Sequence, residues 1–238
     1  MGLSRPRLLT AREAVRSYGV ATAFLLLVTA GLIVSDALPP GRLAALQLWA
    51  STNVTNLHHH PVPALAASAF LPSQATLAWI PLVALAMFGA NRAIGNLRLA
   101  LVCAVGHVLG TLVSEGIVAY RIDTGRLSSS WAHIIDIGPS YVLVSAIVVA
   151  VLLGSVPAKV AALADFAVLV VLGHIFADLS RLHVAPVGHL TAMTTAALLV
   201  ATLALRRAVT ARAASVTARA APVPYAAGGA GDGLPPSP

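Results

Sequence analysis

The chain has 238 residues, of which 58% are hydrophobic and 10% are charged, and its mean hydropathy is +0.87. A soluble globular domain carries about a quarter charged residues, so this composition excludes an ordinary soluble domain and indicates an integral membrane protein. The sequence lacks the alternation of apolar and polar residues that a membrane β-barrel needs, which favours helical spans. The net charge of +7 comes mainly from arginines that flank apolar runs, a pattern typical of membrane topology signals rather than of nucleic-acid binding.

Six apolar segments follow one another along the chain and predict six membrane-spanning helices. Several reach the ~20 residues that a span needs. The first follows a run of arginines like a signal peptide, but five more segments come after it, so we interpret it as an anchor. We therefore expect an all-α, polytopic membrane protein with spans at residues 17–36, 75–90, 97–119, 138–156, 159–177 and 187–205.

The basic residues predict the orientation of these spans. If the N-terminus is cytoplasmic, every basic residue lies on the cytoplasmic side except Arg42, Arg121, Arg126 and Arg181. Both termini are then cytoplasmic.

The same reasoning predicts how the chain is divided. A basic cytoplasmic N-terminus covers residues 1–16, and a six-helix membrane domain covers residues 17–207. Its outer loop, residues 37–74, is too apolar for a solvated loop and is expected to lie in the membrane interface as short amphipathic pieces. The Ala, Pro and Gly content of residues 208–238 predicts a disordered cytoplasmic tail.

Two residues on different predicted helices reach similar depths in the membrane. A helix rises about 1.5 Å per residue, which places Ser140 roughly 28 Å along its helix from Lys159. The same estimate places His189 roughly 26 Å from Arg206. Because both basic residues mark the cytoplasmic side, Ser140 and His189 are expected together near the outer face.

Further ionisable residues are expected near these two. By the same estimate Glu115, His174 and Asp178 fall in the outer layer, and His107 lies nearer the middle of the membrane. Ionisable groups at such depths are costly unless they face one another or water, so this secondary polar layer is a candidate functional cavity. The alternatives are that Glu115 and Asp178 only end their helices at the headgroups, and that His107 bridges two helices.

The remaining histidines allow competing interpretations. His174 and Asp178 are four residues apart on one predicted helix face, where they either line a helix contact or supply a base in place of His189. Residues 58–60 are adjacent histidines in the outer loop, and no carboxylate or cysteine supports them as ligands. We interpret them as a solvated or interfacial run and expect no metal site.

Ser140 and His189 have the chemistry of a nucleophile and its base. Serine is a poor nucleophile unless a base takes its proton, and a neutral histidine within hydrogen-bond reach does this. Gly138 and Pro139 are typical of a helix cap and a first helical position, so Ser140 is expected in the first turn. There the free backbone N–H groups stabilise an oxyanion. The alternative is a packing serine that bonds to the preceding turn.

This combination resembles the rhomboid family of intramembrane serine proteases. Their six-helix core has a large outer first loop, a Gly-x-Ser motif opening the fourth helix, and a histidine preceded by Gly or Ala in the sixth. The matching residues here are Gly138-Pro139-Ser140 and Gly188-His189. The chain is more similar to divergent bacterial rhomboid-like proteins with GHVxxT and GxSY motifs, which appear here as GHVLGT at 106–111 and GPSY at 138–141.

Two departures from the active rhomboid pattern concern the oxyanion site. Active rhomboids usually have glycine after the nucleophile, where this chain has Tyr141. They also carry a histidine and an asparagine one turn apart in the second helix, and the second predicted helix here, residues 75–90, has neither. Gln74 or Thr76 is the replacement donor at about the right height. Losing one such donor costs about 2.7–4 kcal/mol, which is compatible with a slow enzyme or with an inactive one.

The resemblance implies an intramembrane serine protease of the bacterial plasma membrane that needs no cofactor. Its substrate would be a single-span membrane protein, cleaved near the outer face. The catalytic residues implied are Ser140 and His189, with Gly138, Tyr141, Gln74 and Thr76 as oxyanion or supporting residues.

Two other functions stay open. The first is a catalytically silent rhomboid-like protein that binds membrane helices as an adaptor or chaperone. The second is a proton or ion path through Glu115, His174 and Asp178. The partners expected are the lipid bilayer and a membrane-protein substrate or client. No nucleic acid is expected, because neither a phosphate-binding glycine loop nor a base-stacking aromatic series is present.

Overall fold

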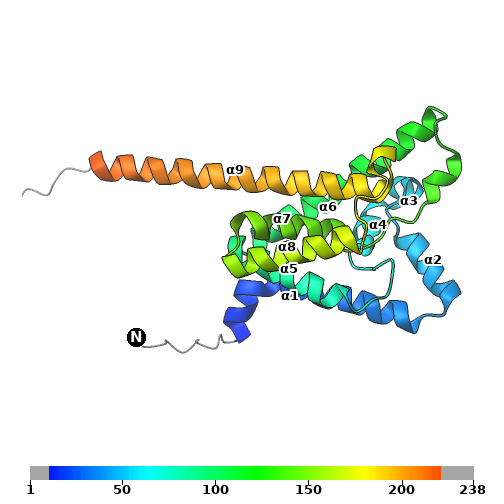
Figure 1. Ribbon diagram of the computed structural model, residues 1–238, viewed down its shortest axis with the longest axis horizontal. Helices are drawn as coiled ribbons and strands as arrows, with labels where there is room; N and C mark the ends of the chain where they lie inside the picture. Colours follow the sequence, from blue (N-terminus) through cyan, green and yellow to red (C-terminus); the bar gives the residue numbers. More distant parts are fainter. Residues whose placement is uncertain (1–10, 221–238) are drawn as a thin grey trace, which may run out of the picture. The chain divides into compact units, whose positions relative to one another are not determined.

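The computed structural model describes residues 11–220, which form α-helices and two short 3-10 helices and contain no strand (Figure 1). The first compact unit ends at Ala201, and residues 202–220 continue the last helix in a second unit. The long helices are α1 (Ala11–Ala37), α5 (Trp79–Ile94), α6 (Asn96–Asp123), α7 (Ser140–Leu153), α8 (Val156–Val171) and α9 (Val184–Ala220). The short ones are α2 (Pro40–Ala50), α3 (Val54–His59), α4 (Pro61–Ser68), η1 (Ser129–His133) and η2 (Leu179–Arg181).

Each long helix corresponds to one of the predicted apolar segments. Stretches of α1, α6 and α9 are long and apolar enough to cross a membrane, at Arg16–Ala37, Asn96–Asp123 and Val184–Arg212. Two shorter helices, α5 and α7, are also apolar. The all-α class is confirmed, and these helices make the chain a multi-pass membrane protein. The number of crossings and the cytoplasmic termini stay predictions.

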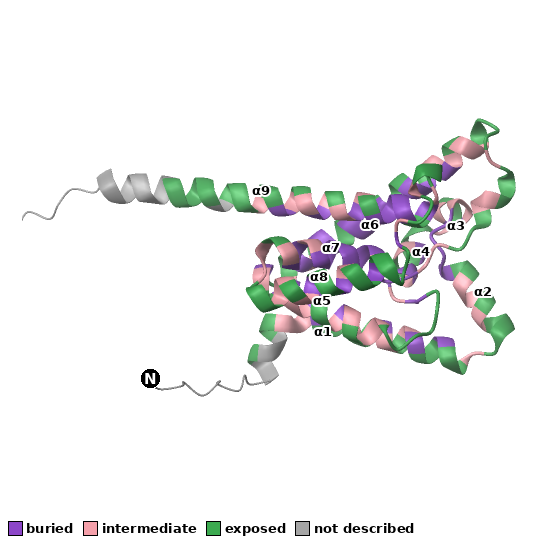
Figure 2. Ribbon diagram, in the orientation of Figure 1, coloured by how far each residue is buried: buried purple, intermediate pink, exposed green. Residues whose placement is uncertain are grey.

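Helix α7 is the centre of the first unit. It packs against α5, α6 and α8, and nearly every residue from Tyr141 to Ala150 is buried (Figure 2). The helix is apolar on all sides, as a helix enclosed by others must be. Its first residues are therefore held by the rest of the bundle.

Two asparagines stabilise a kink in α1. The backbone of Tyr18 is non-helical (φ −135°), which leaves amides and carbonyls around it without helical partners. The Asn91 side chain accepts from the Ala21 amide at 3.1 Å and donates to the Ser17 carbonyl at 2.7 Å. The Asn96 side chain likewise accepts from the Val20 amide at 3.1 Å and donates to the Arg16 carbonyl at 2.7 Å. These bonds join the start of α1 to the α5–α6 connection.

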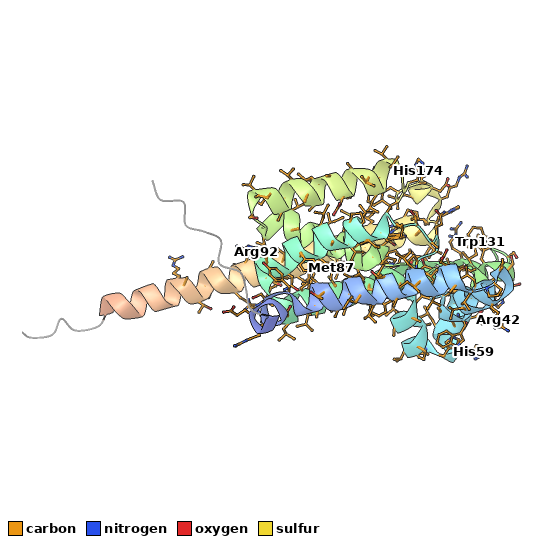
Figure 3. All side chains as sticks on the ribbon, turned by 90° about the horizontal axis from the view of Figure 1, so that it is seen from below. Arg42, His59, Met87, Arg92, Trp131 and His174 are labelled. Carbon is orange, nitrogen blue, oxygen red and sulfur yellow. The ribbon has the colours of Figure 1, made fainter. Side chains whose placement is uncertain are left out.

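The charged residues divide the bundle into two ends. Arg16, Arg92 and Arg98 define what we call the basic end, where Arg92 also donates to the Tyr18 hydroxyl at 3.1 Å. The opposite, loop end carries α2, α3, α4 and η1. Figure 3 shows Arg92 at one end and Arg42 and Trp131 at the other, with Met87 between them. This separation matches the predicted grouping of basic residues on two sides.

The outer loop forms helices and returns into the bundle. Its helix α4 reaches α6, where His107 Nε2 lies 3.0 Å from the Leu65 carbonyl and 3.4 Å from the Ser68 hydroxyl. Asn56 holds the loop together, because its side-chain amide donates to the carbonyls of Leu48 and Ser51 at 2.7 and 2.8 Å. The loop therefore consists of short helices, as predicted, and its position in the membrane interface stays a prediction. His107 is the interhelical bridge that the sequence allowed.

Several helix boundaries differ from the prediction, and α1 already begins at Ala11 rather than at residue 17. Helix α5 begins at Trp79, so Gln74 and Thr76 precede it. Helix α8 ends at Val171 rather than at residue 177, because Gly173 and the left-handed His174 (φ 49°) break the helical ladder. Helix α9 continues through residues 208–220, part of the predicted tail, since this stretch is Ala-rich and free of Gly and Pro. The rest of that tail, residues 221–238, lies outside the described residues.

Candidate functional site

Ser140 is the first residue of α7. The backbone turns into the helix at Gly138, whose φ of 136° suits glycine, and its amide donates to the Ser68 carbonyl at 2.8 Å. Ser140 is half-buried, and within residues 11–220 its hydroxyl forms no hydrogen bond. The serine thus stands at a helix N-terminus with free backbone N–H groups nearby, as the sequence predicted.

His189 is buried in the first turns of α9, with 4% of its surface exposed. Its Nδ1 atom lies 3.1 Å from the carbonyl oxygen of Ile175. A carbonyl only accepts, so Nδ1 carries the proton and, in the neutral ring, Nε2 carries the lone pair. Nε2 is buried and has no partner within the described residues. This tautomer is the one that a general base needs on Nε2.

Tyr141, which directly follows Ser140, packs against His189. Its ring packs edge-on against His189, with centroids 5.0 Å apart, and lies 6.0 Å from the ring of His107. A Cβ atom at Gly188 would collide with the tyrosine ring and hydroxyl, and one at Gly110 would lie 2.9 Å from the Gly188 carbonyl. Two glycines therefore let α6, α7 and α9 meet around Tyr141.

Asp136 joins this centre to the loop end and was not predicted as a site residue. Its carboxylate accepts from the Tyr141 hydroxyl, with both oxygens at 3.3 Å, and from the Thr52 hydroxyl at 3.2 Å. Its backbone amide donates to the Ser51 hydroxyl at 2.8 Å. Burial raises the pKa of Asp136 to about 6, although the hydrogen bonds from Thr52 and Tyr141 oppose the shift.

The sequence holds only a weak signal for Asp136. It is the acidic residue of the apolar stretch IIDIG directly before the Ser140 helix, and that position alone distinguishes it. Its importance depends on Thr52 and Ser51, which lie more than 80 residues earlier in the chain. Only the folded loop brings them to the same place.

A row of buried polar side chains runs along α6 at helical spacing. His107, Thr111 and Glu115 follow one another at intervals of four residues, and each is at most 6% exposed. His107 Nδ1, the Thr111 hydroxyl and both Glu115 carboxylate oxygens lack a hydrogen-bond partner within the described residues. Unpaired polar groups at membrane depth are costly, so the row is a candidate site for internal water or ligand.

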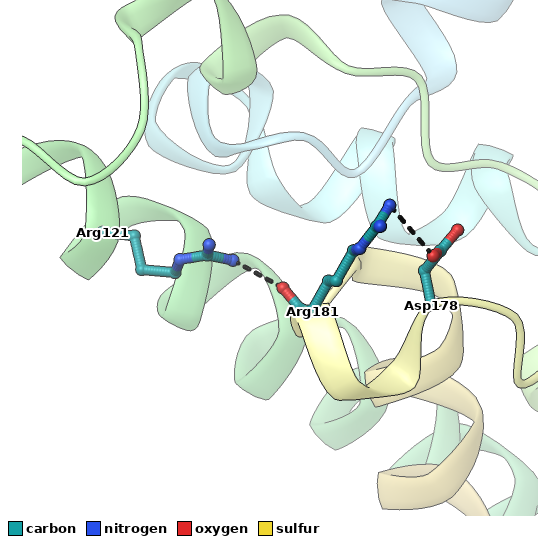
Figure 4. Close-up of polar contacts among 3 residues, drawn as sticks. All are labelled: Arg121, Asp178 and Arg181. Carbon is teal, nitrogen blue, oxygen red and sulfur yellow. Dashed lines mark hydrogen bonds and ion pairs between the residues drawn. The ribbon is translucent and has the colours of Figure 1, made fainter.

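His174 and Asp178 do not belong to this row and lie in the connection between α8 and α9. The predicted pairing on one helix face is wrong, because α8 has already ended and both residues adopt left-handed backbone conformations. Both are exposed, and Asp178 pairs with Arg181 at 3.4 Å. The Arg181 carbonyl in turn accepts from Arg121 of α6 at 2.9 Å, which fastens this connection to the bundle (Figure 4).

A cleft of about 390 Å³ separates this connection from the Asp136 loop. Asp136 and Trp131 line one side, and His174, Asp178 and His183 line the other. Because Asp136 contacts Tyr141, the cleft ends close to the centre formed by Tyr141 and His189.

The predicted oxyanion donors form no hydrogen bond with the start of α7. Gln74 and Thr76 are exposed in the segment before α5, where Thr76 bonds only to local backbone atoms. Of residues 58–60, the first two are exposed and His60 stacks on Trp49. Among residues 11–220 no group of three His, Cys, Asp or Glu side chains is arranged to hold a metal ion.

Apolar spans, a returning outer loop and a Gly-x-Ser helix start facing a Gly-His helix define the class as a rhomboid-like membrane protein. The family model for the rhomboid-like protein family matches residues 12–212, so the chain belongs to this family. No curated protein and no solved structure matches the chain. The resemblance inferred from the two short motifs is confirmed.

Proposed function

We propose that this protein is an intramembrane serine protease in which Ser140 is the nucleophile and His189 the general base. The observation that carries this proposal is the state of His189. The Ile175 carbonyl fixes the proton on Nδ1, and Nε2 is left without a partner beside Tyr141, the residue that follows Ser140. A single-span membrane protein near the loop end would be the substrate.

The proposed reaction uses residues at the loop end. Nε2 of His189 takes the hydroxyl proton as Ser140 Oγ attacks the peptide carbonyl, and gives it to the amine that leaves as the C–N bond breaks. Water, with His189 again as base, then hydrolyses the acyl-enzyme and restores Ser140. The free backbone N–H groups of the first turn of α7 stabilise the oxyanion. Ser140 and His189 share no hydrogen bond within the described residues, so substrate binding would have to complete the pair, as it does in many enzymes.

A second candidate is a catalytically silent protein that binds membrane helices as an adaptor or chaperone. Tyr141 favours it, because its ring packs on His189 and its hydroxyl is held by Asp136. Active rhomboid proteases, which the sequence resembles, usually have glycine at this position. In this candidate, Ser140 and His189 remain as packing residues and the cleft receives a client segment.

Labelling with a fluorophosphonate probe in detergent separates the two candidates. The protease proposal expects labelling of the wild type that is lost in Ser140→Ala and in His189→Gln. Ser145→Ala is the matched control, because Ser145 lies on the same helix and donates to the Tyr141 carbonyl at 2.8 Å. An unlabelled wild type, beside a labelled active rhomboid, overturns the protease proposal and supports the silent protein.

A further inference from the structure

A second cavity, of about 520 Å³, lies between α1, α4 and α6, and neither Ser140 nor His189 lines it. Its walls are apolar and include Phe24 and Leu27 of α1, Leu65 of α4 and Cys103 of α6. The histidine among the lining residues, His107, has its Nε2 atom 3.0 Å from the Leu65 carbonyl oxygen. Pockets that bind small molecules usually have apolar walls and volumes of about 300–1,000 Å³, so this cavity is large enough for a ligand.

The mouth of the cavity faces lipid. Leu27 of α1 and Val62 of α4 line it and are 47% and 74% exposed, and Ala104 of α6 is also exposed, so it opens at the surface between α1 and α6 next to α4. Because α1 and α6 are long and apolar enough to cross a membrane, this surface meets hydrocarbon rather than water. An apolar cavity does not hold water stably, and an empty one loses dispersion contacts along its walls. A hydrocarbon chain fills such a cavity without water and restores the dispersion contacts of its walls.

Positive charge lies at one end of the cavity. The walls begin at Val20, four residues after Arg16, and at Ala100, two residues after Arg98. The Asn96 side chain binds the Arg16 carbonyl at 2.7 Å and the Val20 amide at 3.1 Å, so Arg16 stays close to Val20 across the kink in α1. On α6, Arg98 lies about 3 Å from Ala100 along the helix axis. Both side chains are exposed at the basic end. Arginines at this position attract the headgroup of an anionic lipid.

We propose that this cavity binds one hydrocarbon chain of an anionic phospholipid whose phosphate lies against Arg16 and Arg98. The chain enters between α1 and α6 and ends beneath α4. The chain contacts the returning outer loop, because Leu65 and Ala66 of α4 line the cavity at the loop end. The proposal does not depend on whether Ser140 is catalytic.

The direct test is photo-crosslinking in nanodiscs of the full chain. The probe is phosphatidylglycerol with a diazirine in one chain, and phosphatidylcholine with the same chains is the comparison. We expect adducts concentrated on residues 20–27 and 100–108, with a higher yield for phosphatidylglycerol. Adducts spread evenly over the exposed apolar surface, including α8, would overturn the proposal.

Two sets of variants test the two parts of the site. Ala104→Phe fills the cavity and should reduce the adducts severalfold, whereas Ala164→Phe on the exposed face of α8 should not. Arg16→Gln and Arg98→Gln leave the walls intact. Each should reduce the preference for phosphatidylglycerol by about fivefold, the effect of about 1 kcal/mol per arginine. Equal yields from the two lipids in the wild type contradict the headgroup contact.

Discussion

The Tyr141 hydroxyl lies 3.3 Å from both carboxylate oxygens of Asp136, which ties the first turn of α7 to the loop before it. Asp136 is bound at the same time to Thr52 at the loop end. The position of His189 therefore depends on the outer loop, through Tyr141 and Asp136. Each of these contacts can be removed by a single substitution.

Removing the Tyr141 hydroxyl should destabilise the protein without changing its packing. We expect Tyr141→Phe to lower the free energy of unfolding by about 0.5–1.5 kcal/mol, the usual net value of one hydrogen bond. The measurement is an unfolding titration in mixed micelles. Tyr120→Phe is the control, because Tyr120 is 59% exposed. Equal stability of the two variants would show that the bond to Asp136 contributes nothing.

The pKa of Asp136 predicts a pH dependence of stability with a definite sign. Burial raises the folded pKa to about 6 from an ordinary value of 3.8, so between these values the folded state binds the proton and the unfolded state does not. The contribution of Asp136 to stability therefore falls as pH rises from 4 to 6 and stays low above 6. The full difference is about 3 kcal/mol at most.

The comparison that isolates this effect is wild type against Asp136→Asn. Relative to the variant, the wild type should become more stable as pH is lowered from 7 to 4. The matched control is Asp123→Asn, which makes the same change at an exposed helix end. A wild type that instead loses stability relative to Asp136→Asn on acidification would reverse the sign and refute the assignment.

The contact between Gly188 and Tyr141 predicts that alanine is not tolerated there. A Cβ atom at Gly188 would overlap the tyrosine ring and hydroxyl, so one helix must move. We expect Gly188→Ala to cost about 1–3 kcal/mol. Gly116→Ala on α6 is the matched control, because its Cβ meets open space and alanine favours a helix by up to about 1 kcal/mol.

A partial rescue would identify the clash itself. Tyr141→Ala combined with Gly188→Ala should cost less than the sum of the two single changes, since residues in contact are not additive. Strict additivity in the double variant would mean that Gly188 is needed for another reason.

The kink in α1 predicts a large effect for Asn91. The residue is 1% exposed and satisfies both the Ser17 carbonyl and the Ala21 amide. Asn91→Ala leaves both groups without partners at a cost of about 1–3 kcal/mol each. Thr124→Ala, which removes an exposed hydroxyl at the end of α6, should cost much less. Similar unfolding free energies for the two variants would contradict this role.

The sequence by itself determined the membrane class, the family and the helix segments, because apolar length and flanking charge act locally and need no knowledge of neighbours. It also placed Ser140 at a helix start, since Gly138 and Pro139 specify that turn through their own backbone preferences. The early end of α8 was missed, because Gly173 and His174 interrupt a run that is otherwise apolar.

Only the tertiary structure decided what surrounds the candidate site. Helix rise estimates depth but not the direction in which a side chain points, so it did not separate buried Glu115 from exposed His174 and Asp178. The role of Asp136 required Thr52 to approach from a loop 84 residues earlier. Contacts across such distances depend on packing, and packing brought Tyr141, rather than the Ser140 hydroxyl, against His189.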